Sequence, residues 1–299
     1  MSRSVRGLSV ILCVVVVSAA AFGQGFSSSV TLPYRVVPNI TYLTANNFDA
    51  KLDVYSRTDV TTPQPTLIWI HGGGWTGGNK EGATFSLLPY MEMGWNVVNV
   101  EYRLARVSLA PAAVEDCLCA LRWVIRNAKQ YGFDTTKLVV SGGSAGGHLA
   151  LTTAMIPASA GIDRQCPGTE ELKVAAVVDW YGITDVVDLL DGANMKTYAV
   201  QWLGSMPNRV EIAKRVSPLT YVRSGLPPVI SIQGDADPTV PYSHSVRLQE
   251  VLKKAGVDGE LVTIPGGRHG GFTRVENQRA YTAIKAFLFK HGLGTASSN

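Results

Sequence analysis

The stretch SGGSAGGHLAL, residues 141–151, places one serine among four glycines. Gly142, Ser144 and Gly146 meet the motif G-x-S-x-G, between an apolar strand-like run and a helical pattern. In that context the motif is typical of a sharp strand-to-helix turn that exposes the serine hydroxyl as a nucleophile. The alternative is a glycine-rich helix start in which Ser144 is the N-cap.

A second glycine run, HGGGW at residues 71–75, directly follows the apolar run PTLIWI. Consecutive glycines present backbone N–H groups without side-chain obstruction, as an oxyanion hole requires. We expect the N–H groups of Gly73, Gly74 and Ala145 to be its donors. A phosphate-binding loop is the alternative, but its following Lys-Ser/Thr and its G-x-G-x-x-G spacing are missing. We interpret His71 as a structural hydrogen-bonding residue.

A serine nucleophile needs a base. His269 lies in the glycine-rich segment GGRHGGF, directly after the last predicted strand, and is the predicted base. We interpret His148 as a packing residue, His244 as the start of a helix and His291 as part of a last helical turn.

The orienting acid is expected in QGDADPTVP, which follows the strand-like run PPVISI. Asp235 and Asp237 both qualify by position. Pro238 restricts the backbone of Asp237 and fixes the direction of its side chain, so Asp237 is the predicted acid. We assign Asp235 to the turn itself. The resulting order of nucleophile, acid and base along the chain is the one expected after a serine turn of this kind.

Short apolar runs alternate with helical patterns along most of the chain, which predicts an α/β fold with a largely parallel sheet covered on both faces. Two alternating segments, ITYLTANN and AKLDVYSR, precede them and favour an antiparallel pair. The other predicted strands are PTLIWI, WNVVNVEY, KLVVSG, VAAVVDW, PPVISIQG and GELVTIPG, and the predicted helices span 85–93, 112–130, 145–155, 242–255 and 275–291. Residues 182–223 interrupt this alternation of strands and helices. We interpret them as a small cap segment, with a surface excursion as the alternative.

The first 23 of the 299 residues differ from the rest. Two arginines, an apolar run and small residues have the layout of a secretory signal peptide with cleavage near Gly23 and Gln24. An uncleaved membrane anchor is the alternative, but the apolar run is shorter than the ~20 residues that span a bilayer. We therefore expect residues 24–299 to form one catalytic domain that is secreted or periplasmic, without stable membrane association.

Composition excludes several classes of protein. Hydrophobic residues make up 46% of the chain and charged residues 17%, which fits a globular domain with a sizeable core. Without the two arginines of the leader, 25 basic and 23 acidic residues remain, a net charge of +2. The chain has no basic run, so we expect no nucleic-acid partner. The predicted serine chemistry needs no metal and no cofactor.

Three cysteines follow the predicted cleavage point: Cys117, Cys119 and Cys166. An odd number in an exported protein allows one disulfide and one free thiol, and the spacing does not fit zinc. On the predicted helix 112–130, Cys117 lies on the apolar stripe, whereas Cys119 shares a face with Arg122 and Arg126. We therefore predict a disulfide between Cys119 and Cys166 and a buried, reduced Cys117.

The sequence resembles the α/β-hydrolase esterases and lipases related to hormone-sensitive lipase. Within that group it is similar to small secreted bacterial esterases of the feruloyl and acetylxylan esterase type. The matching segments lie between residues 67 and 272 and read HGGGWTGGNK, VEYRLA, PAAVEDCLCALRWV, SGGSAGGHLAL, VVDWYG, SPLTYV, GDADPTVPY and GGRHGGF. The resemblance implies an α/β-hydrolase fold and the same triad and oxyanion hole as the motifs.

The implied activity is that of a secreted serine carboxylesterase working through an acyl-enzyme. Its substrates would be acetyl, feruloyl or other short-acyl or aromatic esters, on small molecules or on plant polysaccharide. A peptidase or arylformamidase with the same triad is one alternative, and a non-catalytic binding protein on a hydrolase scaffold is another. The aromatic candidates for the substrate pocket are Trp75, Trp180, Tyr181 and Trp202.

The chain departs from the family pattern in two places. Many relatives carry a longer N-terminal cap, whereas only residues 24–70 precede the first glycine run here, so we expect a shallow, open site. The chain also reads YRLARVSLAP where relatives commonly have YRLAPE, which leaves the contacts of Arg106 open. We interpret Arg103 and Asp116 as a structural ion pair.

Overall fold

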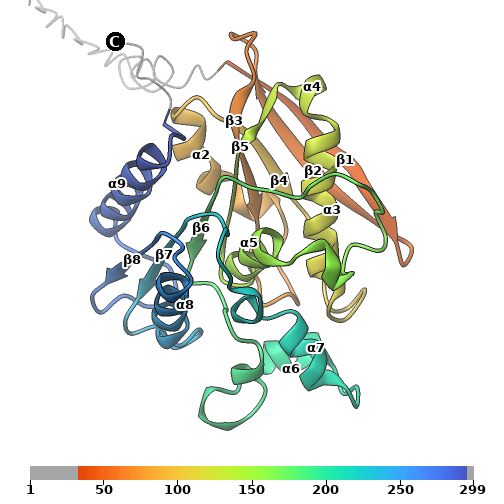
Figure 1. Ribbon diagram of the computed structural model, residues 1–299, viewed down its shortest axis with the longest axis vertical. Helices are drawn as coiled ribbons and strands as arrows, with labels where there is room; N and C mark the ends of the chain where they lie inside the picture. Colours follow the sequence, from red (N-terminus) through yellow and green to blue (C-terminus); the bar gives the residue numbers. More distant parts are fainter. Residues whose placement is uncertain (1–32, 295–299) are drawn as a thin grey trace, which may run out of the picture. The chain divides into compact units, whose positions relative to one another are not determined.

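The computed structural model describes residues 33–294. Within this range an eight-stranded sheet has the order β1-β2-β4-β3-β5-β6-β7-β8 (Figure 1). β2 pairs antiparallel with β1 and β4, and every other neighbouring pair is parallel. The predicted fold class is thereby confirmed. The strands are β1 Tyr34–Ala45, β2 Phe48–Arg57, β3 Gln64–Ile70, β4 Asn96–Val100, β5 Phe133–Gly143, β6 Ala176–Trp180, β7 Val229–Gly234 and β8 Gly259–Ile264.

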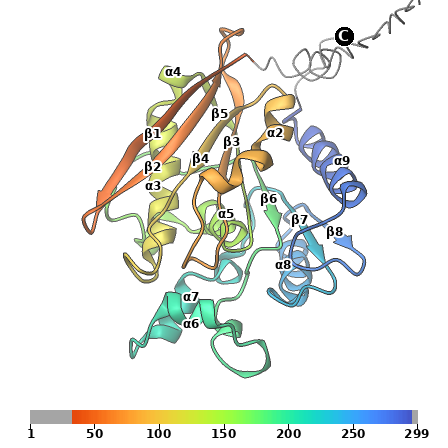
Figure 2. The same ribbon diagram turned by 180° about the vertical axis from the view of Figure 1, so that it is seen from behind.

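Helices cover both faces of the sheet. Figures 1 and 2 show α3, α5 and α8 on one face and α2 and α9 on the other. On the second face Tyr90 of α2 packs edge-on against Tyr281 of α9, with ring centroids 6.5 Å apart. The helices are α2 Thr84–Glu92, α3 Ala112–Arg126, α4 Ala128–Tyr131, α5 Ala145–Met155, α6 Thr197–Leu203, α7 Arg209–Arg215, α8 Ser243–Lys254 and α9 Arg274–Lys290.

The inner strands are buried on both faces, which explains why they read as continuous apolar runs. Every residue of β4, β6 and β7 is buried. All of these parallel strands end at one edge of the sheet, where ligand sites of α/β proteins form. The loops at this edge carry each of the predicted catalytic residues.

Among the element boundaries that differ from the sequence prediction, two have a clear local cause. β1 begins at Tyr34, earlier than the alternating segment at 40–47, because its pairing with β2 continues to Arg57. The predicted helix 112–130 is broken at Asn127, whose side-chain amide donates to the Trp123 carbonyl at 2.8 Å. A short α4 follows and ends at Gly132, which has a left-handed backbone.

Two side-chain links tie α3 to its surroundings. The structure joins Cys119 to Cys166 by a disulfide and leaves Cys117 buried and reduced, as the helical pattern predicts. Arg103 forms a buried ion pair with Asp116, with Nη2 and Oδ1 2.6 Å apart. This pair holds the start of α3 against the loop after β4, in agreement with the structural interpretation.

The segment 182–223 carries α6, α7 and three short 3-10 turns, and it leads from β6 to β7. Figure 1 shows α6 and α7 beyond the carboxyl edge of the sheet.

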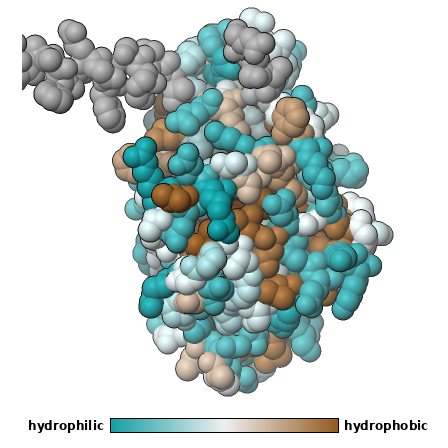
Figure 3. All heavy atoms as spheres, turned by 90° about the vertical axis from the view of Figure 1, so that its left-hand side faces the viewer, coloured by the Kyte–Doolittle hydropathy of each residue, from teal (hydrophilic) through white to brown (hydrophobic). Residues whose placement is uncertain are grey.

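The predicted signal peptide, residues 1–23, lies outside the described residues and stays a prediction. Among the described residues no helix is long and apolar enough to cross a bilayer. Figure 3 shows small groups of apolar residues among polar ones on the side where α9 lies.

Asp179 is a fully buried carboxylate in β6. It accepts hydrogen bonds from the Ser231 hydroxyl and from the Gly182 N–H, both at 2.9 Å. Burial raises the pKa of Asp179 to about 6, although these two hydrogen bonds act to lower it. The carboxylate therefore fixes the turn after β6 at a cost once it is ionised.

We predict that this cost appears as a pH dependence of stability. The folded protein holds the Asp179 proton more tightly than the unfolded chain, so the stabilisation is present below about pH 4 and lost by about pH 6. Compared with wild type, Asp179→Asn should gain about 2–3 kcal/mol in free energy of unfolding between pH 4 and pH 7. Urea unfolding at both pH values measures this difference, and a constant difference would contradict the assignment.

Candidate active site

The turn between β5 and α5 exposes Ser144. Its backbone is strained, with φ 59° and ψ −121°, and its side chain makes no capping hydrogen bond to α5. Ser144 thus occupies the N-cap position of α5, but its hydroxyl does not cap the helix and instead contacts His269. A Cβ atom at Gly146 would lie 2.1 Å from the Ile70 carbonyl oxygen, so only glycine lets α5 approach β3 this closely.

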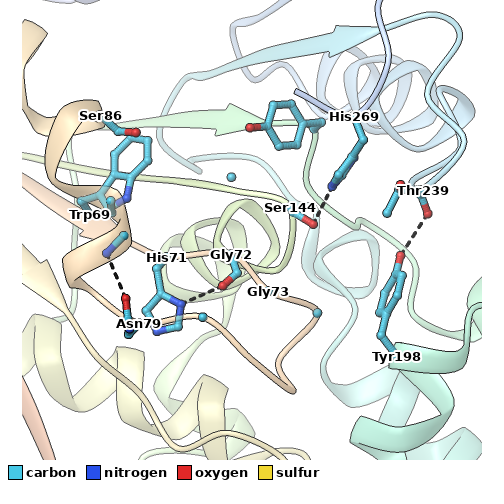
Figure 4. Close-up of a pocket in the computed structure, with 16 residues that line it drawn as sticks. Trp69, His71, Gly72, Gly73, Asn79, Ser86, Ser144, Tyr198, Thr239 and His269 are labelled. Carbon is cyan, nitrogen blue, oxygen red and sulfur yellow. Dashed lines mark hydrogen bonds between the residues drawn. The ribbon is translucent and has the colours of Figure 1, made fainter. Parts of the chain in front are cut away.

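The structure brings the three predicted triad residues together. His269 Nε2 lies 2.8 Å from Ser144 Oγ, and His269 Nδ1 lies 2.7 Å from Asp237 Oδ2 (Figure 4). The His269 side chain is 19% exposed, whereas that of Asp237 is fully buried. This is the geometry in which an imidazole can accept the serine proton while a carboxylate orients it.

The loop after β7 holds Asp237 as an anion. Its Oδ1 accepts the N–H groups of Thr239 and Val240 at 2.8 and 3.0 Å. Burial alone would raise the pKa of Asp237, but the hydrogen bonds from His269 and from this backbone lower it below its ordinary value. Asp235 instead accepts the Gly266 N–H at 2.6 Å, which places it in the turn as predicted.

Two of the predicted oxyanion donors, Gly73 and Gly74, line the same cavity as Ser144 and His269, and the third, Ala145, directly follows Ser144. Gly73 has φ 122°, and a Cβ there would lie 2.1 Å from the Gly77 carbonyl oxygen. Among the described residues, the N–H groups of Gly73 and Gly74 form no hydrogen bond within the protein. Ala145 begins α5, where N–H groups have no partner within the helix. These three donors remain available to a ligand beside Ser144.

Trp75 attaches the oxyanion loop to the core beneath it. It is fully buried, and its indole N–H donates to His148 Nδ1 at 3.2 Å. His148 lies on α5, and its Nε2 donates to the Val216 carbonyl at 2.7 Å. Burial lowers the pKa of His148 to about 3, so the ring stays neutral and can accept the Trp75 N–H at neutral pH. The loop is thereby tied to the nucleophile helix.

This arrangement corrects part of the predicted substrate pocket. Trp75 and Trp202 were expected to line it, but both are fully buried and stack on each other with centroids 4.1 Å apart. The prediction is wrong for both residues. The positive φ of Trp75, 58°, directs its side chain into the core beneath the loop, and Trp202 of α6 stacks on it there. Trp180 is also buried and borders a smaller adjoining pocket.

A cavity of about 540 Å³ lies over the triad. Tyr181 lines it, as predicted, and its ring centroid is 4.7 Å from that of His269. Several lining residues were missed by the sequence reasoning: Trp69, Asn79, Ser86, Tyr198 and Thr239. Figure 4 shows Trp69 and Ser86 on one side of Ser144, and Tyr198 and Thr239 on the other. Tyr198 comes from α6, so the segment 182–223 forms part of the cavity wall.

The remaining histidines have structural partners. His71 lines the cavity but stacks on Tyr102 at 4.3 Å, and its Nδ1 donates to the Gly72 carbonyl at 2.7 Å. His244 is buried, accepts the Thr184 N–H and contacts Asp188. Among the described residues no group of acidic, histidine and cysteine side chains could hold a metal ion.

The fold and the site together define an α/β-hydrolase with a serine, histidine and aspartate at the carboxyl edge of its sheet. Residues 52–252 match the BD-FAE family, and the chain belongs to that family. This match includes Ser144 and Asp237 and ends before His269.

Proteins of similar sequence and structure carry the names of esterases or ester hydrolases. LipM and esterase LipQ of Mycobacterium tuberculosis are 32% and 33% identical to the chain, over 80% and 69% of its length. The chain spans only 57% and 50% of those two relatives. Esterase 2 of Thermogutta terrifontis has a TM-score of 0.73 at 29% identity, covering 89% of this chain and 97% of that one. A truncated carbohydrate esterase from gut microbiota has a TM-score of 0.75 at 25% identity, with 87% and 98% covered.

We predict that Trp75→Phe impairs catalysis while leaving substrate binding intact. The variant keeps an aromatic ring but removes the N–H that ties the oxyanion loop to His148. Because oxyanion donors act mainly in the transition state, kcat on p-nitrophenyl acetate should fall about tenfold with little change in KM.

Trp95→Phe is the matched control. Trp95 is equally buried, and its indole N–H has no hydrogen-bond partner among the described residues. This variant should keep the wild-type kcat. Equal kcat values for both variants would show that the Trp75 contact has only a packing role.

Proposed function

We propose that the protein is a serine carboxylesterase that hydrolyses short-acyl or aromatic esters. The observation that carries this proposal is the continuous contact from Ser144 Oγ through His269 to Asp237, at 2.8 and 2.7 Å. Gly73 and Gly74, whose N–H groups have no partner among the described residues, border the same cavity, and Ala145 directly follows the nucleophile at the start of α5. Family membership and the esterases among its relatives support the same activity.

The reaction follows from these positions. His269 Nε2 takes the Ser144 proton as Oγ bonds to the ester carbonyl carbon, and the carbonyl oxygen becomes an anion facing the glycine donors. His269 then gives its proton to the departing alcohol, and an acyl-enzyme remains. Water attacks this acyl group through the same base, which releases the acid and restores Ser144. Asp237 stays ionised and stabilises the imidazolium throughout.

The substrates we propose are acetyl and feruloyl esters, including those on plant polysaccharide. Two observations on relatives support a small acyl group: Thermogutta esterase 2 has been solved with butyrate and with propionate bound. The gut carbohydrate esterase among the structural neighbours supports a sugar-bearing ester. The cavity of about 540 Å³, with Trp69 and Tyr181 in its wall, has room for an aromatic acyl group.

We also propose that the protein is exported. The leader at residues 1–23 has the layout of a signal peptide. The disulfide between Cys119 and Cys166 supports this proposal, because disulfides form and persist in oxidising compartments outside the cytosol. The mature protein purified from the culture medium or periplasm should begin at or near Gln24. Amino-terminal sequencing would overturn the proposal if the extracted protein still began at Met1.

The activity is tested with p-nitrophenyl acetate, acetylated xylan and methyl ferulate. Ser144→Ala should lose about a thousandfold or more in kcat, because no nucleophile remains. Asp237→Asn should lose about 10³–10⁴-fold, since the amide no longer holds the correct imidazole tautomer. The control Asp235→Asn, two residues away, should stay within a few-fold of wild type. Wild-type rates in Ser144→Ala would refute the proposed nucleophile.

A further inference from the structure

A second hollow, of about 460 Å³, opens beside the catalytic cavity. Gly78 and Asn79 line both hollows, so the two meet at the loop that follows the oxyanion glycines. We call this second hollow the β2 groove. Its walls include Phe48, Asp49, Lys51, Asn79, Glu81 and Arg106.

The topology of the sheet places the β2 groove at the catalytic edge. β2 runs antiparallel to β4, and Leu52 pairs with Val100 at the end of β4. The first residues of β2 therefore lie at the edge where the parallel strands end and the catalytic loops begin. Phe48 and Lys51 come from this strand, whereas Arg106 comes from the loop after β4.

The floor of the groove is rigid. Lys80 is buried and pairs with Asp53 at 2.9 Å and with Glu81 at 2.7 Å. The Lys80 N–H donates to a Glu101 carboxylate oxygen at 2.9 Å, and the Lys80 carbonyl accepts from Asn99 at 2.7 Å. A buried, fully paired lysine thus fixes the loop that separates the groove from the cavity.

The walls of the groove, in contrast, carry side-chain donors that have no hydrogen-bond partner among the described residues. Among the described residues, neither Lys51 Nζ nor the Arg106 guanidinium forms a hydrogen bond or an ion pair, and the Asn79 side-chain NH₂ donates to no protein group. Asp49 and Glu81 each use one carboxylate oxygen within the protein, for the Thr44 hydroxyl and for Lys80, and their second oxygens are acceptors beside these donors. Phe48 is half-buried: it packs against the small apolar cluster that contains Ala50 and Cys119, and it also borders the groove. Donors, acceptors and one aromatic surface in an open groove are suited to a ligand rich in hydroxyl groups.

We propose that the β2 groove binds the carbohydrate part of an ester substrate whose reacting acyl group lies at Ser144. This inference rests on the proposed esterase function and assigns the place where the sugar of its substrate binds. Charges of both signs line the groove, which favours a neutral, hydroxyl-rich ligand over an anion. The sugar hydroxyls would pair with Asn79, Lys51 and Arg106, and a sugar face would lie against Phe48.

The other neighbouring pocket suits such a ligand less well. It has a volume of about 160 Å³ and is bordered by Trp69, Trp180, Tyr181 and Phe272 among others. A cavity of about 150 Å³ holds a single benzene ring. The side pocket thus has room for one aryl group, whereas the β2 groove is large and open enough for part of a saccharide chain.

The test compares esters that share an acyl group and differ in the alcohol. An acetylated xylo-oligosaccharide is compared with p-nitrophenyl acetate, and a feruloylated xylo-oligosaccharide with methyl ferulate. For Phe48→Ala and Arg106→Ala we expect kcat/KM on the sugar esters to fall at least tenfold. The same variants should stay within about twofold of wild type on the two simple esters, because neither residue contacts the triad.

Phe289→Ala is the matched control, since Phe289 is 72% exposed on α9 and borders neither hollow. It should leave both kinds of substrate unaffected. Arg106 is exposed, so its variant remains informative if Phe48→Ala fails to fold. Equal losses on sugar and simple esters, or wild-type turnover of simple esters only, would overturn the assignment of the groove. Absence of all ester hydrolysis by the wild-type protein would instead refute the proposed function.

Discussion

The close contact between β3 and α5 is the constraint on which the site depends. The Ile70 carbonyl oxygen lies only 2.1 Å from where a Cβ of Gly146 would be, so the end of β3 and the first turn of α5 touch directly. The oxyanion loop continues from Ile70, and Ser144 immediately precedes α5. Nucleophile and oxyanion donors therefore come from two segments with a fixed separation. The hydrogen bond between Trp75 and His148 joins the oxyanion loop to α5 at a second point.

Two buried aspartates near this edge differ in their partners, and the difference explains which one can serve His269. Asp179 accepts two uncharged donors, and burial raises its pKa to about 6. Asp237 accepts two backbone N–H groups and pairs with His269, and its pKa falls below the ordinary value. Of the two, only Asp237 lies within hydrogen-bond distance of His269, at 2.7 Å. Asp179 fixes the turn from which Tyr181 reaches the cavity.

Much of the site could be predicted because its parts are local in sequence. The serine turn, the glycine loop and the Asp-Pro loop each carry their own backbone requirements within a few residues. The order of strands and helices follows from apolar runs of characteristic length. The Cys119–Cys166 link could also be predicted, since the helical pattern separates Cys119 from the apolar face.

Other features depend on tertiary contacts that no short pattern contains. The sequence suggests Trp75 as a lining residue because it adjoins the glycine run, yet its positive φ directs the ring inward. Tyr198 reaches the cavity only through the path of the segment 182–223. The β2 groove combines Phe48 with Arg106, residues of separate elements that meet because β2 pairs antiparallel with β4.

The N-terminal hairpin thus has a consequence beyond completing the sheet. A long cap inserted before β3 could cover the catalytic edge, but here the chain uses its first described residues for β1 and β2. Among residues 33–294, the amino end of β2 borders the groove beside the oxyanion loop. An enzyme that acts on esters carried by a polymer needs such an opening, because the chain on either side of the ester must remain outside the cavity. The hairpin of β1 and β2 therefore supplies part of the surface on which we propose that the saccharide rests.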